Sequence, residues 1–156
     1  MKIEIPKMED YEATNALAAQ VHELHVKWRP DLFRSVDAVI TEEEFEELID
    51  NHEIYIVRLK NRVVGYMIIK VKEKKHQNEK MRYRKMLNIE AMCIDEDDRG
   101  FGIGTALLEY AKEVGIENGC TDMYLTVNEE NKAAIRVYEK FGMRVKNIAY
   151  SMEIHK

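Results

Sequence analysis

Three glycines alternate with other residues in the run Arg99-Gly100-Phe101-Gly102-Ile103-Gly104-Thr105. An apolar stretch at 86–94 precedes this run and predicts a buried strand, and the amphipathic stretch 106–116 after it predicts a helix. The first N–H groups of a helix have no partners within the helix, and the helix dipole adds positive charge there. Glycines let an anion approach the backbone closely, and the arginine adds a fixed charge. The spacing therefore predicts a phosphate-binding turn.

The glycine spacing excludes two common nucleotide-binding patterns. The P-loop pattern G-x-x-x-x-G-K-[ST] is absent. The dinucleotide pattern G-x-G-x-x-G also fails, because Thr105 or Leu107 stands where the third glycine would be needed. What remains is R-x-x-G-x-G, or a glycine-rich turn that merely connects a strand to a helix.

The composition is that of one globular domain spanning residues 1–156, with 46% hydrophobic and 34% charged residues. No apolar run reaches the roughly 20 residues that a membrane span needs, and the N-terminus lacks the apolar core of a signal peptide. Cys93 and Cys120 stand alone in apolar surroundings, without a C-x-x-C pair. They predict buried thiols in a reducing cytoplasm, and we expect neither a metal site nor a membrane partner.

The net charge of −5 is unevenly distributed. Residues 70–85 carry eight Lys or Arg and two Glu, a local charge of +6, which leaves −11 for the rest of the chain. Because nucleic-acid-binding domains are usually basic overall, we expect no nucleic-acid partner. The basic segment is either a solvated charged face or a surface that steers an acidic partner or substrate.

The first half of the chain predicts two helices and a hairpin. A short strand ends at Pro6, Asp10 is an expected N-cap, and an apolar stripe then runs along a helix to Trp28. His22 and His25 flank that stripe and are interpreted as partly exposed helix residues. A capping box, Thr41-x-x-Glu44, starts a second helix that ends near residue 51. The strands 53–59 and 63–71 then join through a two-residue turn.

The second half predicts two parallel strands joined by a helix. The strands at 86–94 and 123–127 flank the helix that follows the glycine turn, so a right-handed crossover is expected. A further helix covers 133–141. Val145 and residues 148–154 then predict a last pair of antiparallel strands.

Two motifs in this half resemble a known family. The pattern R-x-x-G-x-G at 99–104 resembles the pyrophosphate-binding signature of the GNAT superfamily of acyl-CoA-dependent N-acetyltransferases. The pattern N-x-x-A-x-x-x-Y, from Asn131 through Ala134 to Tyr138, is similar to the C-terminal signature of that family. The resemblance covers the whole chain in element order, and most closely residues 87–143. One departure is Met143 where the family usually has phenylalanine.

The resemblance implies a mixed α/β (α+β) fold, with a mostly antiparallel sheet that splays open at its parallel strand pair and helices on both faces. The pantetheine arm of acetyl-CoA would enter that gap, and Asn131 would bind it or shape its slot. Trp28 and Phe33 would line the acceptor entrance, although a well-packed turn between helices is an equal alternative. The remaining cofactor-binding residues would be Met92, Cys93 and Ile94 for pantetheine and Arg99, Gly100, Phe101, Gly102, Ile103, Gly104 and Thr105 for the pyrophosphate.

Two residues are candidates for the chemistry of acetyl transfer. Tyr138 resembles the general acid of the family and would protonate the departing CoA thiolate. Its alternative is a core tyrosine whose hydroxyl binds a backbone carbonyl. Glu90 is the candidate base, directly or through a water, because a carboxylate within an apolar strand must be paired, hydrated or functional. Its alternative is an ion pair with Arg82 or Arg84.

The expected function is acyl transfer (EC 2.3.1 type) from acetyl-CoA to a primary amine, by direct attack in a ternary complex. An acyl-cysteine at Cys93 is disfavoured because no histidine is placed to activate it. The alternative is a non-catalytic acyl-CoA-binding sensor or interaction module with the same fold. The acceptor is expected to be a small-molecule or peptide amine. The last strands would offer an edge for a homodimer.

Overall fold

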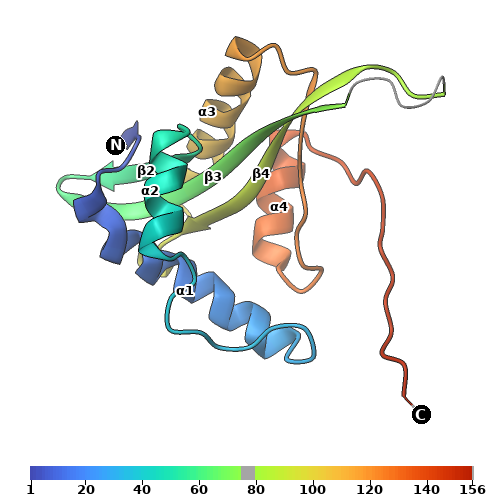
Figure 1. Ribbon diagram of the computed structural model, residues 1–156, viewed down its shortest axis with the longest axis horizontal. Coiled ribbons are helices and arrows are strands. Elements are labelled where there is room, and N and C mark those ends of the chain that lie inside the picture. Colours follow the sequence, from blue (N-terminus) through green and yellow to red (C-terminus); the bar gives the residue numbers. More distant parts are fainter. Residues whose placement is uncertain (75–79, 156) are drawn as a thin grey trace.

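A five-stranded sheet forms the centre of the molecule in the computed structural model, which describes residues 1–74 and 80–155 (Figure 1). The strand order is β1-β2-β3-β4-β5. The first four strands pair antiparallel, whereas β4 and β5 pair parallel, as the crossover predicted. The strands are β1 (Lys2–Glu4), β2 (Ile54–Leu59), β3 (Arg62–Lys74), β4 (Arg84–Ile94) and β5 (Asp122–Leu125).

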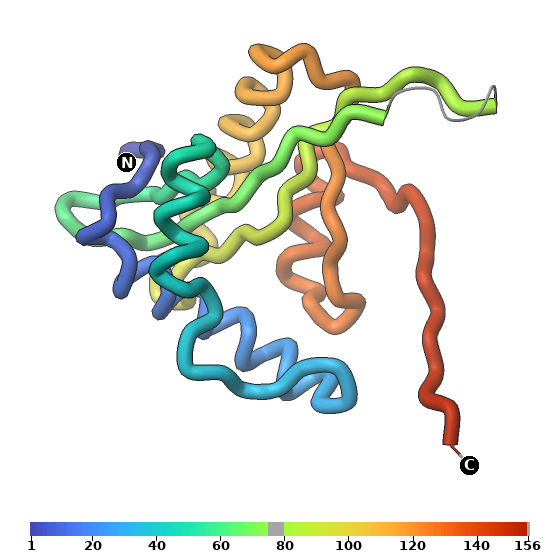
Figure 2. Tube along the Cα trace, viewed as in Figure 1, coloured from blue at the N-terminus to red at the C-terminus, as the bar shows by residue number. Residues whose placement is uncertain are grey.

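Two pairs of helices cover the two faces of this sheet, as Figure 2 also shows. The helices α1 (Tyr11–Trp28) and α2 (Glu42–Asp50) pack on one face. The helices α3 (Ile103–Glu117) and α4 (Lys132–Phe141) pack on the other. Two short 3-10 helices, η1 (Met8–Asp10) and η2 (Glu96–Asp98), precede α1 and α3. The predicted mixed α/β class with helices on both faces is confirmed.

Two helices begin at the N-cap residues that the sequence predicted, Asp10 for α1 and Thr41 for α2. The Thr41 hydroxyl accepts a hydrogen bond from the Glu44 N–H at 3.1 Å, and Glu44 caps the Thr41 N–H in return, so the capping box is formed. Asp10 occupies the N-cap of α1, but its side chain makes no cap bond there. Its carboxylate instead accepts from the Lys7 N–H and from Arg58, which fixes η1 against the sheet.

The parallel pair separates along its length. The last register pair between β4 and β5 joins Ile89 to Leu125, whereas β4 continues to Ile94. Past Ile89, the side of β4 that faces β5 therefore pairs with no strand among the described residues. Its other side remains paired with β3 as far as Ile94, opposite Gly65. This separation is the splayed opening that the family resemblance implied.

The predicted last pair of antiparallel strands is absent from the described residues. After α4 the chain runs as a single extended segment, residues 144–155, that leaves the body of the fold (Figure 1). The sequence prediction was wrong here because alternation specifies a strand but does not supply the neighbour that its N–H and C=O groups need.

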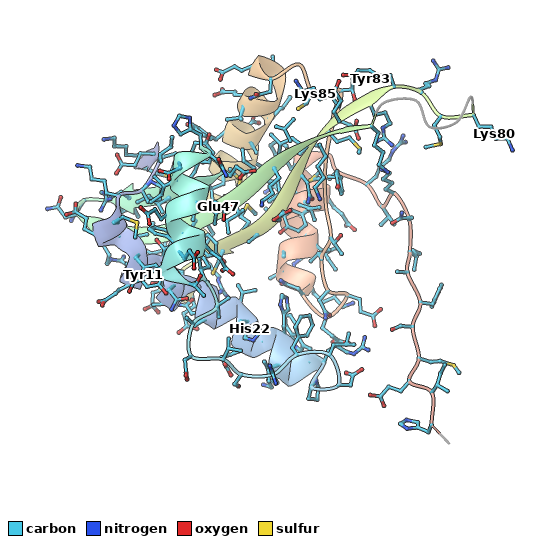
Figure 3. All side chains as sticks on the ribbon, in the orientation of Figure 1. Tyr11, His22, Glu47, Lys80, Tyr83 and Lys85 are labelled. Atoms are coloured by element: carbon cyan, nitrogen blue, oxygen red, sulfur yellow. The ribbon has the colours of Figure 1, made fainter. Side chains whose placement is uncertain are left out.

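The basic segment 70–85 lies partly outside the described residues, since 75–79 are not described. Its described ends belong to β3 and β4, and Tyr83 and Lys85 lie near the start of β4 (Figure 3). Several of its side chains have partners: Lys72 pairs with Glu90, Arg84 pairs with Asp122, and Tyr83 donates a hydrogen bond to Glu73. No helix among the described residues is long and apolar enough to cross a membrane.

Candidate functional site

The glycine turn presents a set of unpartnered backbone N–H groups at the start of α3. Gly100 and Gly102 adopt positive φ angles of 86° and 84°, which side chains rarely tolerate. The first hydrogen bond of the helix runs from the Ala106 N–H to the Gly102 carbonyl. Within residues 1–74 and 80–155, the N–H groups of Ile103, Gly104 and Thr105 have no hydrogen-bond acceptor. This geometry suits an anion at the helix N-terminus.

Space above the turn is open as well. A Cβ added at Gly100 or Gly102 would meet nothing within 4 Å, and one at Gly104 would meet only Val137 Cγ1 at 3.6 Å. Phe101 is 80% exposed, so its side chain leaves the turn uncovered. Arg99 is exposed and donates from Nε to the Ile94 carbonyl at 3.0 Å, which ties it to the end of β4.

The acidic run before the turn is held by residues that the sequence analysis did not identify. Arg62 at the start of β3 donates to both carboxylate oxygens of Asp98, at 2.9 and 3.0 Å. The Gln20 side chain on α1 accepts from the Glu96 N–H at 3.3 Å. Positive charge from Arg62 offsets negative charge that would otherwise oppose an anion nearby. Both partners are distant in sequence, so no local pattern could have revealed them.

The end of β4 lies beside this turn. Cys93 is buried, whereas Met92 and Ile94 are half-buried. Gly65 allows β3 to approach closely, because a Cβ there would lie 3.0 Å from Ile94 Cδ1 and 3.1 Å from the Cys93 carbonyl oxygen. The opposite edge of β4 has backbone groups available to an extended ligand, which could pair as an added strand would.

Glu90 occupies a β-bulge in β4. Ile89 pairs with Ile69 and Ala91 with Ile68, so Glu90 has no residue opposite it on β3. Bulges redirect side chains and are common beside active sites. The Glu90 side chain is 36% exposed and lies 3.8 Å from Lys72 Nζ. The predicted ion-pair partners were wrong: Arg84 pairs with Asp122 instead, because both stand at the starts of the neighbouring parallel strands.

Tyr138 on α4 contributes a hydroxyl that has no partner among residues 1–74 and 80–155. Its ring packs against the core between α3, α4 and the sheet. The hydroxyl makes no hydrogen bond to any described residue, and no described polar side-chain atom is both buried and unpartnered. The predicted alternative, a bond to a backbone carbonyl, is therefore absent from the described structure. Burial raises the pKa of the phenol, and the nearby Cys93 thiol raises it further.

Cys93 is an inert thiol by its surroundings. Burial raises its pKa to about 11, although Arg99 opposes the shift. The sulfur donates to the Leu17 carbonyl of α1 at 3.3 Å. A thiol that stays protonated at neutral pH is a poor nucleophile.

Asn131 is the N-cap of α4. Its side-chain oxygen accepts from the Ala134 N–H at 3.2 Å, which accounts for the spacing N-x-x-A in structural terms. The side-chain NH2 group retains its capacity to donate to a ligand.

Aromatic side chains gather at the end of α1. The His25 ring stacks on Phe33 at 5.3 Å, and lies 5.9 Å from Trp28 and on the same helix as His22 (Figure 3). His22 Nε2 lies 2.7 Å from the Arg34 carbonyl oxygen. Trp28 and Phe33 thus belong to one cluster with the two histidines. Burial lowers the pKa of His25 in this cluster, and the nearby His22 lowers it further. Both histidines are partly exposed helix residues, as predicted, but the sequence did not predict their ring contacts with Phe33.

This cluster lies on the same side of the molecule as the turn before α4. Arg29, directly after α1, forms a bidentate pair with Asp31 at 2.7 and 2.9 Å. The hydrogen bonds to Asp31 raise the pKa of Arg29 against the opposing effect of burial, and the carboxylates of Glu153 and Glu129 add to the rise. The end of α1 is therefore within electrostatic range of the turn that leads to Asn131.

A metal site and a separate hollow are the other places where a ligand could bind. Among the described residues no group of three or more His, Cys, Asp or Glu side chains could hold a metal ion. A hollow of about 300 Å³ is lined by Leu87, Gly115 and Cys120 among others. It lies at the C-terminal half of α3, and hence away from the glycine turn and Tyr138.

Comparison with known proteins places these features in context. Residues 18–143 match the model of the acetyltransferase (GNAT) family. An uncharacterized N-acetyltransferase of Methanocaldococcus jannaschii is 38% identical over 65 residues, which cover 42% of this chain and 29% of the relative. The match therefore spans less than a third of that relative's length.

Solved structures share the fold over almost the whole chain. A Bacillus halodurans protein, solved as a mutant, superimposes with a TM-score of 0.94 and 27% identity, covering 99% of this chain and all of the other. An aminoglycoside N-acetyltransferase in complex with CoA superimposes with a TM-score of 0.72 and 13% identity, over 99% and 100% of the two chains.

Proposed function

This chain belongs to the GNAT acetyltransferase family, and we propose that it transfers the acetyl group of acetyl-CoA to a primary amine by direct attack in a ternary complex. One observation carries the proposal. The unpartnered N–H groups of residues 103–105 stand at the end of β4, where that strand has parted from β5. A phosphate site beside an open strand edge fits a ligand with a diphosphate and an extended, amide-bearing arm.

Acetyl-CoA would bind along these two features. The diphosphate would accept hydrogen bonds from the glycine turn, from Arg99 through Thr105. The pantetheine arm would pair with backbone groups at Met92, Cys93 and Ile94, and the Asn131 amide would donate to it from the other side. CoA is the ligand of the structurally similar aminoglycoside N-acetyltransferase.

The reaction requires two proton transfers. The amine nitrogen attacks the thioester carbonyl carbon, a C–N bond forms, and the C–S bond of the tetrahedral intermediate then breaks. Glu90 would take the proton that the amine loses, directly or through a water, because its bulge and partial exposure leave it accessible. The Tyr138 hydroxyl would give its proton to the departing CoA sulfur. Its raised pKa keeps it protonated at neutral pH, so it is available as a donor.

The acceptor would approach from the end of α1. Trp28 and Phe33 offer apolar ring surfaces there, and the rest of the chain outside residues 70–85 is acidic. Such surroundings favour an amine-bearing cation over an anion. The substrate class is therefore a primary amine, either a small molecule or a peptide.

A non-catalytic acyl-CoA sensor is the competing function. It is disfavoured because the Tyr138 hydroxyl bonds no described residue and so is free to donate to a ligand, which acid catalysis uses and binding alone does not require.

A thiol-release assay separates the two functions. The protein is incubated with acetyl-CoA and a panel of primary amines that includes polyamines, amino acids, aminoglycosides and lysine peptides, and free CoA is measured. We expect release that depends on at least one amine and saturates with acetyl-CoA. Binding of CoA by calorimetry without release for any amine would favour the sensor, and absence of CoA binding would overturn both.

A further inference from the structure

The helices α1 and α2 cover only part of their face of the sheet. The core beneath them reaches Ile68 on β3 and its register partner Ala91 on β4. Beyond that row, β3 and β4 continue past α2, as Figure 1 shows. The side chains that follow on this face are only half-buried, among them Lys70, Asn88 and Tyr124.

These three polar side chains form one row across the open part of the face. Lys70 on β3 pairs with Asn88 on β4, and Asn88 pairs with Tyr124 on β5. Residues two apart on a strand point the same way, so Lys70 shares the face of Ile68. Register partners also share a face, and neighbouring strands lie only about 4.8 Å apart. The three side chains therefore start as neighbours on the side of the sheet that α1 and α2 cover.

Each member of this row is a hydrogen-bond donor that the described residues leave unused. Among residues 1–74 and 80–155, the Lys70 ammonium, the Asn88 side-chain amide and the Tyr124 hydroxyl make no hydrogen bond or ion pair. The ammonium has three N–H donors, the amide two and the hydroxyl one. Lys146 adds positive charge, because its Nζ lies 5.3 Å from the centre of the Tyr124 ring. Such a row suits an anion with several acceptor oxygens, such as a carboxylate.

Two carboxylates on this face already have cations of their own. Asp122 pairs with Arg84, and Glu90 lies 3.8 Å from Lys72 Nζ. The strand register places Lys70 between Asp122 and Glu90, yet no described carboxylate lies within ion-pair distance of Lys70. Its charge is therefore available to a ligand that lies next to the candidate base.

We propose that this row binds a carboxylate of the acceptor, and that the acceptor amine is the α-amino group of a free amino acid. The inference rests on the proposed function, because it assigns a substrate to the site of Glu90. Glu90 follows Asn88 by two residues, which corresponds to about 7 Å along a strand. One small molecule can therefore present its amine to Glu90 and its carboxylate to Lys70. The acidic balance of the rest of the chain attracts the amine, and the row selects the amines that carry a carboxylate.

Other primary amines would leave the row unused. Polyamines and aminoglycosides have no carboxylate, and their additional ammonium groups would be repelled by Lys70 and Lys146. In a peptide, many bonds separate the terminal carboxylate from the amines. A site whose donors match one group of the substrate discriminates strongly against an analogue that lacks this group.

Matched pairs of acceptors provide the first test. The standard L-amino acids are offered with acetyl-CoA, and each one that is acetylated is compared with the amine formed by removing its carboxylate. L-phenylalanine is paired with phenethylamine, for example, and L-leucine with isoamylamine. Rates are expressed per neutral amine, because the amines of a pair differ in pKa. We expect kcat/KM to be roughly 30-fold higher, or more, for the amino acid. Equal values, or CoA release with other amines and with no amino acid, would overturn the inference and leave acetyl transfer intact.

Substitution of Lys70 tests whether this preference comes from the row. Lys70→Met should lower kcat/KM for the amino acid roughly 30-fold and reduce the preference to about 3-fold, whereas Lys70→Arg keeps the charge and should retain most of it. Lys74→Met is the matched control, because Lys74 lies on the same face of β3 but is exposed and opposite Arg84. It should leave the preference unchanged. Equal effects of Lys70→Met and Lys74→Met would assign the preference to general positive charge and overturn the inference.

Binding measurements test the carboxylate site separately from turnover. Saturation-transfer NMR of the standard L-amino acids with the full chain and CoA should detect at least one that binds the wild type and not Lys70→Met. Such binding without CoA release for any amine would support the carboxylate site and overturn acetyl transfer. If no amino acid binds in a manner that depends on Lys70, the inference is wrong whatever the outcome of the thiol-release assay.

Discussion

Tyr138 on α4 and Cys93 on β4 lie close enough that a charge on the thiol would raise the pKa of the phenol. Tyr138 belongs to the core beneath α3 and α4, whereas the side chain of Cys93, on β4 itself, belongs to the core beneath α1 and α2. The two cores approach each other here because β5 has ended and β4 continues. We propose that the hydroxyl of Tyr138 donates from this place to a ligand laid along the free edge of β4.

Replacement of Tyr138 by phenylalanine tests the proposed acid. We expect kcat to fall roughly 10- to 1000-fold, the range for one acid–base group, while CoA affinity changes little because the ring remains. Tyr110→Phe is the matched control, since that tyrosine packs against Tyr55 on the same face of the sheet. Steady-state kinetics and calorimetry measure both effects. Wild-type turnover in the Tyr138 variant would remove this residue from the mechanism.

Cys93 should take no part as an acyl carrier. Its pKa of about 11 leaves it protonated at pH 7 to 8, and its proton is directed to the Leu17 carbonyl. Incubation with acetyl-CoA should therefore give no acetylated Cys93 by mass spectrometry of the acid-quenched protein, and Cys93→Ala should keep turnover within about 10-fold. An acetyl adduct that forms and decays at the rate of turnover would show a ping-pong mechanism instead.

Glu90 and Lys72 can be separated by their pH profiles. Glu90→Gln removes a base, so the rise of kcat/KM with pH should weaken, whereas Lys72→Met breaks only the 3.8 Å pair and should leave the shape of the profile unchanged. Turnover is measured from about pH 6 to 9 with the same amine. If both substitutions lower stability equally and neither alters the profile, Glu90 serves only as an ion-pair partner.

The glycine turn allows a test of phosphate binding without loss of folding. Gly104 has an ordinary φ and room for a Cβ, so Gly104→Ala should leave the melting temperature nearly unchanged. The added methyl group should weaken CoA binding at least 10-fold by obstructing the N–H groups at the start of the helix. Gly102→Ala forces a side chain into a positive φ and should cost about 1–2 kcal/mol of stability. Thermal melts with and without CoA compare the two. Undiminished CoA affinity in Gly104→Ala would place the diphosphate elsewhere.

The ion pair of Arg84 and Asp122 should make stability depend on pH. Burial opposes ionisation of Asp122, but hydrogen bonds from Arg84 and Thr121 outweigh it, so its pKa lies below the ordinary 3.8. A lowered pKa stabilises the folded state above about pH 4, and that stabilisation disappears as the pH falls through the folded value. Because the pair is partly exposed, Asp122→Asn should cost about 1 kcal/mol or less at pH 7. The difference in free energy of unfolding between wild type and Asp122→Asn, measured with urea, should narrow toward pH 3. A difference that stays constant with pH would show that it arises from packing.

The sequence alone determined most of the elements and the position of the glycine turn. Periodicity and caps are local, so α3, α4, the capping box at Thr41 and the parallel pair around the glycine turn could all be predicted. The turn itself was predictable because glycine spacing directly reports a backbone conformation, as the positive φ of Gly100 and Gly102 confirms. Tyr138 and Glu90 could be named as candidates, but their roles remain proposals.

Only the tertiary structure decided which way the side chains of β4 point. Leu87 and Ile89 face α3 and α4, whereas Ala91 and Cys93, at the same alternation, face α1 and α2. The bulge at Glu90 switches the face of the sheet to which the following side chains point. It lies where the adjacent residues Ile68 and Ile69 of β3 pair with residues that are two apart on β4. The tertiary structure likewise decided that Arg62 and Gln20 bond the acidic residues before the glycine turn, and that residues 144–155 have no strand partner among the described residues. Both outcomes depend on residues far apart in the sequence. Local sequence sets backbone preference, but the neighbour that satisfies a strand edge or a charge comes from a distant part of the chain.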